Sequence, residues 1–590
     1  MANHYPFFKL GSYRLLTTVI LSGLFISILY SISSSAVPFR HDRTKTDPPP
    51  KPNFSEGQKP SNERPETLYL DKFGASKEYQ LEATGYWRLG EVADRTMLID
   101  PLGHPFTIIG VTKVDPGHYR DETYDALYGG REVQWAKDTA NLLEEWRFNT
   151  ISVRSRLDLL INSVVLRFPY IKLADTIDPE ALNRKEEDYG DMWDSDYHQK
   201  VINSVEDIIN KHGQDEYLIG IMVSNEANPC LRTVSGEWDN MAVWWKALLK
   251  VDLGHADALR EFSALMNERY AGDIAAFNAV YGTTFSTFDE IQTVGLEIFT
   301  PFETIEPGEE EHAQMAYLDI AAWNALMMKQ LHTIVYDAAK ARLPHIIVFS
   351  NAFKNNFCDD EILKAIAEKS DITVINRYVS GDNPVPDDSY VNYFSKETNN
   401  HPIFINEFSF TTPGHEGGVY PVVPDQPARA DAFIQYRNAA LANPLVVGVS
   451  WFTLADGPCK DYLACDSDED AYINFGLESR DIVVYDEMIT KGTELWTDPY
   501  KISLSLIRGK DSGETKIPLK PTGGNSKEFW GPPDPISKDT AKWFHLNPLD
   551  PSGGERNKYF KADPLSPLNP TVEKNFSFEL IPKTKEDVSR

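Results

Sequence analysis

Cysteine is scarce in this sequence. The 590 residues include four cysteines, and none of them stands in a Cys-x-x-Cys or Cys/His pattern of the kind that binds zinc. The sequence therefore predicts no zinc site. Cys459 and Cys465 flank a short loop that a disulfide could close, whereas Cys230 and Cys358 each follow a strand-like run. The second pair can form a disulfide if those two strand ends are neighbours.

Positive charge is also in deficit. The chain has 58 Lys and Arg residues against 88 Asp and Glu residues, which gives a formal net charge of −30. A field of this sign repels nucleic acid and anionic membrane surfaces, while an uncharged substrate feels little of it. The acidic residues are spread along the chain, as is typical of a solvated surface. The composition therefore argues against a nucleic-acid partner.

The N-terminal region lacks charge over a long stretch, from Leu15 to Phe39. An apolar run of about 20 residues is long enough to cross a bilayer. We expect a signal-anchor over residues 15–37 after a cytoplasmic segment 1–14; cleavage after Ala36, as in a signal peptide, is the alternative. Both predict the secretory pathway, either as a single-pass membrane protein with a lumenal or extracellular domain or as a secreted one. Asn53 and Asn575 lie in glycosylation sequons.

Two proline-rich regions, a stalk over 38–66 and an extension over 508–590, flank a long alternating region, 67–507. Eight apolar runs, typical of buried strands, alternate there with helical patterns such as 131–148 and 316–341: 106–111, 149–153, 170–174, 217–223, 345–349, 372–376, 402–406 and 445–451. This pattern predicts an α/β fold, a (β/α)8 TIM barrel. An open doubly wound sheet is the alternative, but no Gly-rich phosphate loop follows the first run. The helical stretch 236–340 predicts an insertion after strand four.

Two glutamates stand just after apolar runs. Glu226 follows the fourth run and Glu407 the seventh, and a barrel brings the carboxyl ends of its strands to one rim. A facing pair of carboxyl groups is the apparatus of glycoside hydrolysis: one with a raised pKa protonates the leaving oxygen, and the other attacks the anomeric carbon. Retention of configuration requires the two groups to lie about 5–5.5 Å apart.

Residues at other strand ends are candidates for substrate binding. The amide of Asn225 can hold a sugar hydroxyl without adding charge beside the acid. Tyr378 can donate a hydrogen bond to the nucleophile and keep it ionised, and the flat face of Trp451 can stack on a sugar ring. The full set of expected binding residues is Asn225, Arg154, Asn376, Tyr378, Trp451 and Asp456.

The Asn-Glu after strand four and the Glu after strand seven resemble the signature of the 4/7 superfamily of retaining glycosidases, which includes β-galactosidases. Within it, the chain is most similar to family-50 agarases, through "LIDPLGHPFTIIGV" (98–111), "YLIGIMVSNE" (217–226), "INEFSF" (405–410) and other short motifs between about 85 and 505. The resemblance implies that Glu226 is the general acid/base, that Glu407 is the nucleophile and that Asn225 binds the hydroxyl next to the reacting carbon. Arg147 departs from the pattern, because such sequences usually carry Gly there.

Together these features predict a retaining glycoside hydrolase that acts on a β-galactan, agarose-like or related polysaccharide or oligosaccharide. The reaction requires neither a metal nor an organic cofactor. A membrane-tethered carbohydrate-binding protein whose barrel has lost turnover is the alternative of another class. Within the enzyme class, a β-galactosidase, a β-mannanase and a glucanase all stay open, because specificity depends on loops.

Overall fold

The structure is a computed structural model, and its described residues all belong to one compact unit, Pro60–Arg590. These residues are 70–92, 95–162, 167–174, 191–227, 229–230, 256–294, 298, 311–355, 357–412, 421–458 and 472–488. The predicted membrane segment, the stalk, the C-terminal extension, Asn53, Asn575, Cys459 and Cys465 lie outside them. Within the described ranges, no helix has both the length and the apolar character needed to cross a bilayer.

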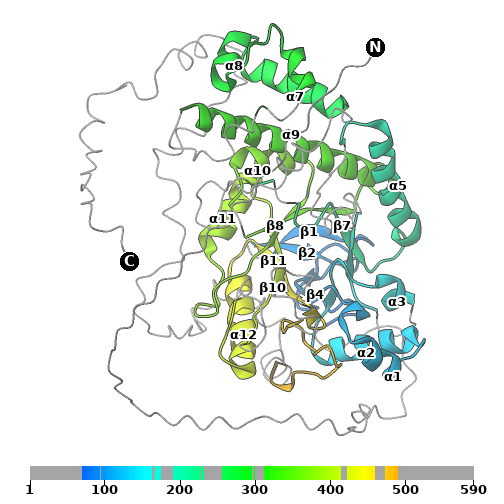
Figure 1. Cartoon of the computed structure of the whole chain (residues 1–590). Coiled ribbons are helices and arrows are strands. Elements are labelled where there is room, and N and C mark those ends of the chain that lie inside the picture. The colour runs from blue at the N-terminus through cyan, green and yellow to red at the C-terminus, as the bar shows by residue number, and fades with distance from the viewer. Residues whose placement is uncertain are drawn as a thin grey trace, which may run out of the picture. The chain divides into compact units, whose positions relative to one another are not determined.

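Eight parallel strands form a closed barrel at the centre of the fold (Figure 1). Around the barrel the order is β10-β11-β4-β5-β6-β7-β8-β9, so each strand neighbours the next one in the chain and β11 closes the ring on β4. The strands are β4 (Ile108–Thr112), β5 (Thr150–Ile151), β6 (Tyr170–Leu173), β7 (Leu218–Met222), β8 (Ile347–Lys354), β9 (Ile372–Asn376), β10 (Ile403–Phe408) and β11 (Val446–Phe452). Each overlaps a predicted apolar run, which confirms the TIM barrel.

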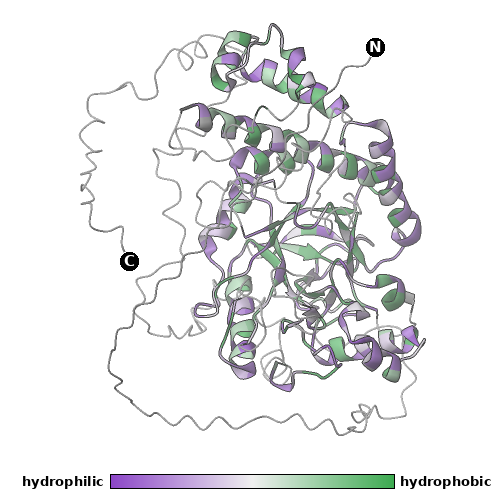
Figure 2. Ribbon diagram, viewed as in Figure 1, coloured by the Kyte–Doolittle hydropathy of each residue, from purple (hydrophilic) through white to green (hydrophobic). Residues whose placement is uncertain are grey.

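The barrel strands are buried on both faces, which explains their continuous apolar sequences. Every residue of β7 and of β11 is buried, and the central strands are the most uniformly apolar part of the ribbon in Figure 2. Close strand packing also depends on glycine. A Cβ atom added to Gly448 of β11 would lie 2.3 Å from the Cβ of Ile108 in β4, so no side chain fits where these two strands meet.

Helices on the outside of the barrel present apolar stripes to the strands and polar residues to solvent (Figure 2). Asp194 caps the N-terminus of α5 by accepting hydrogen bonds from the backbone N–H groups of Asp196 and Tyr197. The helices between strands are η1 (Pro116–His118), α1 (Asp121–Leu127), α2 (Glu132–Glu145), α3 (Leu157–Asn162), α5 (Ser195–His212), α10 (Asp360–Ala367), α11 (Asp388–Glu397) and α12 (Gln426–Ala442). After β11 comes a short hairpin of β12 (Gly457–Pro458) and β13 (Tyr472–Ile473).

Arg147 illustrates a local conflict between residue type and backbone. It follows the end of α2 with a φ of +63°, in the left-handed region that glycine adopts most easily. Its backbone N–H donates to the carbonyl of Glu144, which completes the end of the helix. The conformation explains why glycine suits this position, and why arginine there carries backbone strain.

The connection between β7 and β8 is longer than one helix, as the sequence predicted. It contains α7 (Ala256–Arg269), α8 (Ile274–Tyr281), η2 (Phe288–Thr293) and α9 (Glu311–Arg342). The buried carboxylate of Asp319 in α9 joins these elements. It accepts hydrogen bonds from Arg269 Nε at 2.6 Å, from Tyr270 Oη at 2.7 Å and from Tyr281 Oη at 2.6 Å. A buried charge with three donors is well satisfied, so the insertion has its own polar centre.

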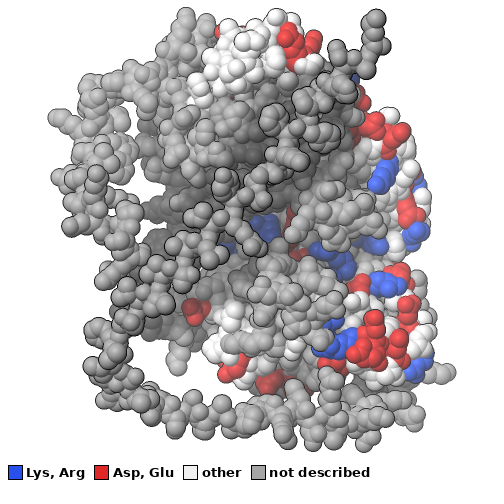
Figure 3. All heavy atoms as spheres, viewed as in Figure 1, with Lys and Arg blue, Asp and Glu red and all other residues white. Residues whose placement is uncertain are grey.

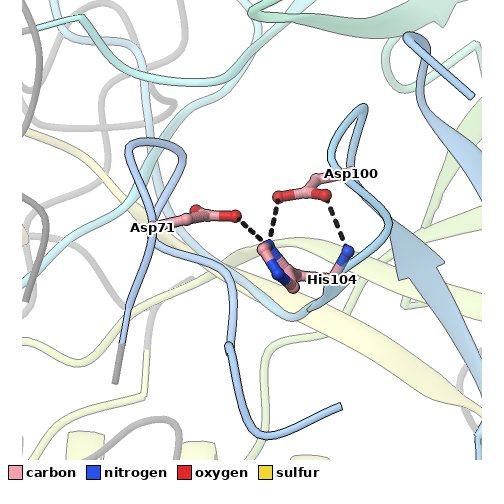
Figure 4. A group of neighbouring side chains, drawn as sticks. All are labelled: Asp71, Asp100 and His104. Carbon is pink, nitrogen blue, oxygen red and sulfur yellow. Dashed lines mark hydrogen bonds and ion pairs between the residues drawn. The ribbon is translucent and has the colours of Figure 1, made fainter. Parts of the chain in front are cut away.

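A small antiparallel sheet precedes the barrel and was not predicted from the sequence. It consists of β1 (Arg88–Val92), β2 (Arg95–Ile99) and β3 (Pro105–Phe106). Beside it, Asp71, Asp100 and His104 point toward one another (Figure 4). The Nδ1 of His104 lies 2.6 Å from Asp71 Oδ2, a hydrogen-bond distance, whereas two ligands of one tetrahedral ion lie about 3.3 Å apart. We interpret the trio as a hydrogen-bonded cluster.

Candidate active site

Glu226 lies at the carboxyl end of β7 in a constrained backbone. Its φ is +57°, and its N–H donates to the carbonyl of Ala352 in the neighbouring β8 at 3.0 Å. Both carboxyl oxygens accept hydrogen bonds. Oε1 accepts from Asn376 Nδ2 at 2.9 Å, and Oε2 accepts from Lys354 Nζ at 3.0 Å. The side chain is 24 % exposed, so this carboxylate is held at the rim and reached by solvent.

Glu407 lies on the same rim, as the second-last residue of β10, and is 2 % exposed. Tyr378, which follows β9, donates its hydroxyl to Glu407 Oε2 at 3.0 Å. The other oxygen, Oε1, is buried and has no hydrogen-bond partner among the described residues. One oxygen of this carboxyl group is thus fixed, and the other is left without a donor.

Amide side chains connect the two glutamates. Asn376 donates both to Glu226 Oε1 and, at 3.3 Å, to Asn225 Oδ1. Asn406, the residue before Glu407, donates to Asn225 Oδ1 at 3.3 Å and to Asn376 Oδ1 at 3.2 Å. Because Asn225 turns its oxygen into this network, its Nδ2 is the atom that can donate to a ligand. The strand ends of β7, β9 and β10 are therefore joined into one constellation.

The two carboxyl groups titrate as a coupled pair. Burial and, after it, the charge of Glu226 together raise the pKa of Glu407 to about 7, against opposing effects of Arg154, Lys354 and Tyr378. Burial also acts to raise the pKa of Glu226, but the charge of Lys354 and the hydrogen bonds from Asn376 and Lys354 outweigh it, so this pKa falls below its usual value. When the pair binds a single proton, these effects favour its location on Glu407, which is the reverse of the order expected from the sequence.

Trp451 does not face the site, contrary to expectation. It is fully buried, donates its indole N–H to the carbonyl of Phe475 at 3.0 Å, and packs edge-on against Phe408 and Phe433. Phe433 belongs to α12, so the ring points away from the barrel axis toward the covering helix. Side chains alternate along a strand, and this alternation places position 451 on the outer face. The predicted sugar platform is a core residue.

Asp456 is likewise unable to bind sugar hydroxyls in this structure. It is fully buried, and both of its oxygens are used: Oδ1 accepts from the N–H of Gly476 at 2.8 Å and Oδ2 from Tyr485 Oη at 2.6 Å. Burial raises the pKa of Asp456 to about 7. Its role is to hold the segment after β13 against the end of the barrel.

Arg154 is placed where the sequence predicted, after β5, and is exposed. Its φ of +60° turns the chain sharply at the rim. Its charge lowers the pKa of both Glu226 and Glu407, so the guanidinium lies near both. No hydrogen bond or ion pair of its side chain is found within the described part of the chain. Arg154 is therefore an exposed cation beside the paired carboxyl groups.

Sequence reasoning missed Lys354 and Asn406. The fifth strand was expected to end at residue 349, because the polar Ser350 and Asn351 follow, but β8 continues to Lys354. The added residues carry Lys354 to the rim. Asn406 is the last residue of a predicted strand. In the sequence, only its position immediately before Glu407 indicated a role in the site. Its Oδ1 accepts from Ser152 Oγ at 2.7 Å, so it crosses the inside of the barrel.

Cys230 and Cys358 form a disulfide, with Cα atoms 4.5 Å apart. Cys230 comes four residues after Glu226, and Cys358 comes four residues after Lys354. The bond therefore joins the two segments that follow β7 and β8. It therefore lies close in sequence to both members of the Glu226–Lys354 ion pair.

Comparisons with known proteins show similarity to agarases. Beta-agarase A of Vibrio sp. (strain JT0107) is 25 % identical over 349 residues, which are 55 % of this chain and 32 % of that protein. The crystal structure of the agarase AgWH50C superposes with a TM-score of 0.58 at 17 % identity, covering 74 % of this chain and 68 % of that one. The chain resembles agarases. No family model matches the sequence.

A second solved structure, that of an exo-beta-agarase, has the same TM-score of 0.58 at 16 % identity, with 74 % of this chain and 68 % of that chain covered. At such identities the likeness to solved structures demonstrates a shared fold. The predicted similarity to agarases is thus confirmed in sequence and in fold. Because the chain spans about a third of the length of the Vibrio protein, its own activity is a matter for proposal.

Proposed function

We propose that this chain is a retaining glycoside hydrolase that cleaves an agarose-like β-galactan by double displacement. The observation that carries the proposal is the constellation at the rim. Glu226 after β7 and Glu407 in β10 lie in one hydrogen-bonded group with Asn225, Asn376 and Tyr378. The similarity to agarases supports the substrate class. A protein that only binds sugar has no need of two coupled carboxyl groups.

In the first step, Glu407 attacks the anomeric carbon while Glu226 donates a proton to the glycosidic oxygen. The bond to the leaving sugar breaks, and a covalent glycosyl-enzyme forms. Tyr378 holds Oε2 of Glu407 at 3.0 Å, which leaves Oε1 as the attacking atom. Before this step the proton of the pair must move from Glu407 to Glu226, because the nucleophile has to be ionised and the acid protonated.

In the second step, Glu226, now ionised, removes a proton from a water molecule that attacks the anomeric carbon. The ester to Glu407 breaks, the sugar leaves with its original configuration, and Glu226 again holds the proton. The positive charge of Arg154 and Lys354 stabilises the carboxylate of Glu407 as it leaves. One water molecule is consumed for each bond cleaved.

The test is proton NMR of the first product formed from agarose or its oligosaccharides, before mutarotation. We expect the β-anomer to appear first in the wild type and no product in Glu407→Gln. Glu368→Gln, at an exposed position at the C-terminus of α10, is the matched control and should keep wild-type activity. An α-anomer as first product would refute double displacement, and wild-type activity in Glu407→Gln would refute the nucleophile.

The same purified protein, tested on a panel of oligosaccharides, distinguishes the proposed function from its alternatives. Activity on mannan or glucan oligosaccharides, with none on galactans, would favour a β-mannanase or a glucanase. Binding of galactan without cleavage of any substrate would favour the carbohydrate-binding protein. The amide network around Asn225 fits any sugar with a free hydroxyl beside the reacting carbon, so the substrate panel decides between them.

A further inference from the structure

Lys354 occupies a position that conflicts with the proposed acid. It is the last residue of β8, and its Nζ lies 3.0 Å from Glu226 Oε2. Asn376 takes the other oxygen of Glu226. A carboxyl group whose two oxygens both accept from N–H donors is held in its ionised form. In this arrangement Glu226 lacks the proton that protonation of a leaving group requires.

The ion pair can open. The side chain of Lys354 is 37 % exposed, and a lysine ammonium is a flexible point charge on a four-carbon stem. An ion pair that is partly open to water contributes little to stability, so the two side chains can separate at low cost. What must be supplied is a new partner for the ammonium group close to Glu226, because an ammonium left beside Arg154 without an anion would be unfavourable. An uncharged sugar offers hydroxyl oxygens alone.

Arg154 adds a second cation to the same rim. It is exposed, has no side-chain partner within the described ranges, and lies close enough to act on Glu226, Glu407 and Lys354. An arginine keeps its charge at every working pH. On the face that Figure 3 shows, the basic and acidic side chains of the described residues are interspersed, in a chain whose net charge is −30. Two cations in reach of one another at the reaction centre are therefore a local feature.

Resting on the proposed function, we propose that the substrate is a galactan that carries an anionic substituent, a sulfate or a carboxylate, on the sugar of the leaving side. Glu226 faces the bond to that sugar, so Lys354 beside it is the residue that meets the substituent. The anion draws Lys354 away from Glu226 and takes its place as the partner of the ammonium. Glu226 then accepts the proton of the pair, and Glu407 becomes the ionised nucleophile.

The long-range charge of the protein does not oppose this specificity. At physiological ionic strength, fields decay over about 8 Å, so a substituent at the rim responds mainly to Lys354 and Arg154. The proposal thus links recognition to activation. With a neutral galactan Lys354 stays paired with Glu226 for most of the time, so cleavage is slow, whereas an anionic galactan draws Lys354 away and cleavage is faster. The effect of the anion should appear in kcat as well as in KM.

The experiment compares three oligosaccharides of one β-galactan backbone: neutral, sulfated and carboxylated. We expect the wild type to favour at least one anionic form by about tenfold or more in kcat/KM, a difference that high salt reduces. Lys354→Met, which keeps the length of the side chain, should bring the ratio of anionic to neutral substrate close to 1. Lys211→Met removes an exposed lysine of α5 that pairs with Asp207 and should keep the wild-type ratio.

The proposal is overturned if the wild type cleaves the neutral form as well as both anionic ones, or if Lys354→Met retains the preference. An aryl β-galactoside with an activated leaving group distinguishes failure of the anionic-substrate proposal from failure of the proposed hydrolase function. Cleavage of this compound without any anion preference rejects the substrate class alone, whereas no cleavage of any compound rejects the hydrolase. In that case calorimetric binding of the three oligosaccharides to Glu407→Gln still tests whether Lys354 recognises the anionic substituent. Equal affinities for the three oligosaccharides would reject this recognition. A preference for an anionic form that Lys354→Met abolishes would support it.

Discussion

Tyr378 donates a hydrogen bond to one oxygen of Glu407 and leaves the other oxygen of that carboxyl group without a donor in the described part of the chain. The two atoms, Tyr378 Oη and Glu407 Oε2, are 3.0 Å apart. The contact orients a nearly buried carboxyl group and favours its ionised form. Both effects are those that a nucleophile needs, and the first prediction concerns them.

Tyr378→Phe should lower kcat by roughly 10- to 100-fold, because a hydrogen bond to a charged group contributes about 1.5–3 kcal/mol. It should also move the acidic limb of the pH–rate profile upward. The hydroxyl lowers the pKa of Glu407, so its removal raises that pKa, and a higher pH is then needed to ionise the nucleophile. The measurement is kcat/KM from pH 4 to 9. A reduced rate with an unmoved limb would mean that Tyr378 acts only through packing.

Glu226→Ala should distinguish substrates by their leaving groups. General acid catalysis contributes about 10²- to 10⁴-fold, so hydrolysis of a galactan should fall by an amount in this range. An aryl β-galactoside with an activated leaving group needs no proton, so its first step should lose little. Steady-state kinetics on both substrates, with azide added to replace the water, provide the measurement. Equal losses on the two substrates would remove Glu226 from the role of acid.

Asp456→Asn should change how stability depends on pH. In the folded protein burial raises the pKa of Asp456 to about 7, whereas the unfolded chain has an ordinary value near 4. As pH rises from about 4 to 7 the unfolded chain loses this proton first, so the free energy of unfolding falls over that window and is level above it.

Asparagine imitates the protonated carboxyl group: it can accept from Gly476 and donate to Tyr485. The variant should therefore lose part of the decline in stability between pH 4 and 7. Urea unfolding at several pH values compares it with the wild type. Asp481→Asn, at an exposed side chain, is the control. Parallel curves for Asp456→Asn and the wild type would show that the group is already ionised at pH 4.

Removal of the disulfide by Cys230→Ser with Cys358→Ser should lower the free energy of unfolding by about 2–5 kcal/mol. The cross-link joins residues 128 positions apart, and a long loop restricts the unfolded chain most. Guanidinium unfolding of the variant and of the oxidised and reduced wild type provides the measurement. The wild type and the double variant should agree when both are reduced. Equal stability of the oxidised wild type and the variant would contradict the prediction.

The sequence alone determined the barrel and the positions of its two glutamates. Strands buried on both faces have continuous apolar sequences, and helices repeat their apolar residues every three or four positions, so both can be recognised locally. Glu226 and Glu407 stand where such strands end, and the topology of any parallel barrel places those ends on one rim. Neither conclusion requires knowledge of a side-chain contact.

Tertiary structure decided what each rim residue touches. Trp451 and Asp456 have suitable chemistry, but strand alternation turns the first outward, and the second is buried with both oxygens bound to the segment after β13. Lys354 reaches Glu226 because β8 continues beyond two polar residues. The direction of a side chain at a strand end depends on register and on neighbouring strands, which are contacts between residues far apart in the chain. The ionisation of the glutamates follows from those contacts, so it too was decided only when the chain folded.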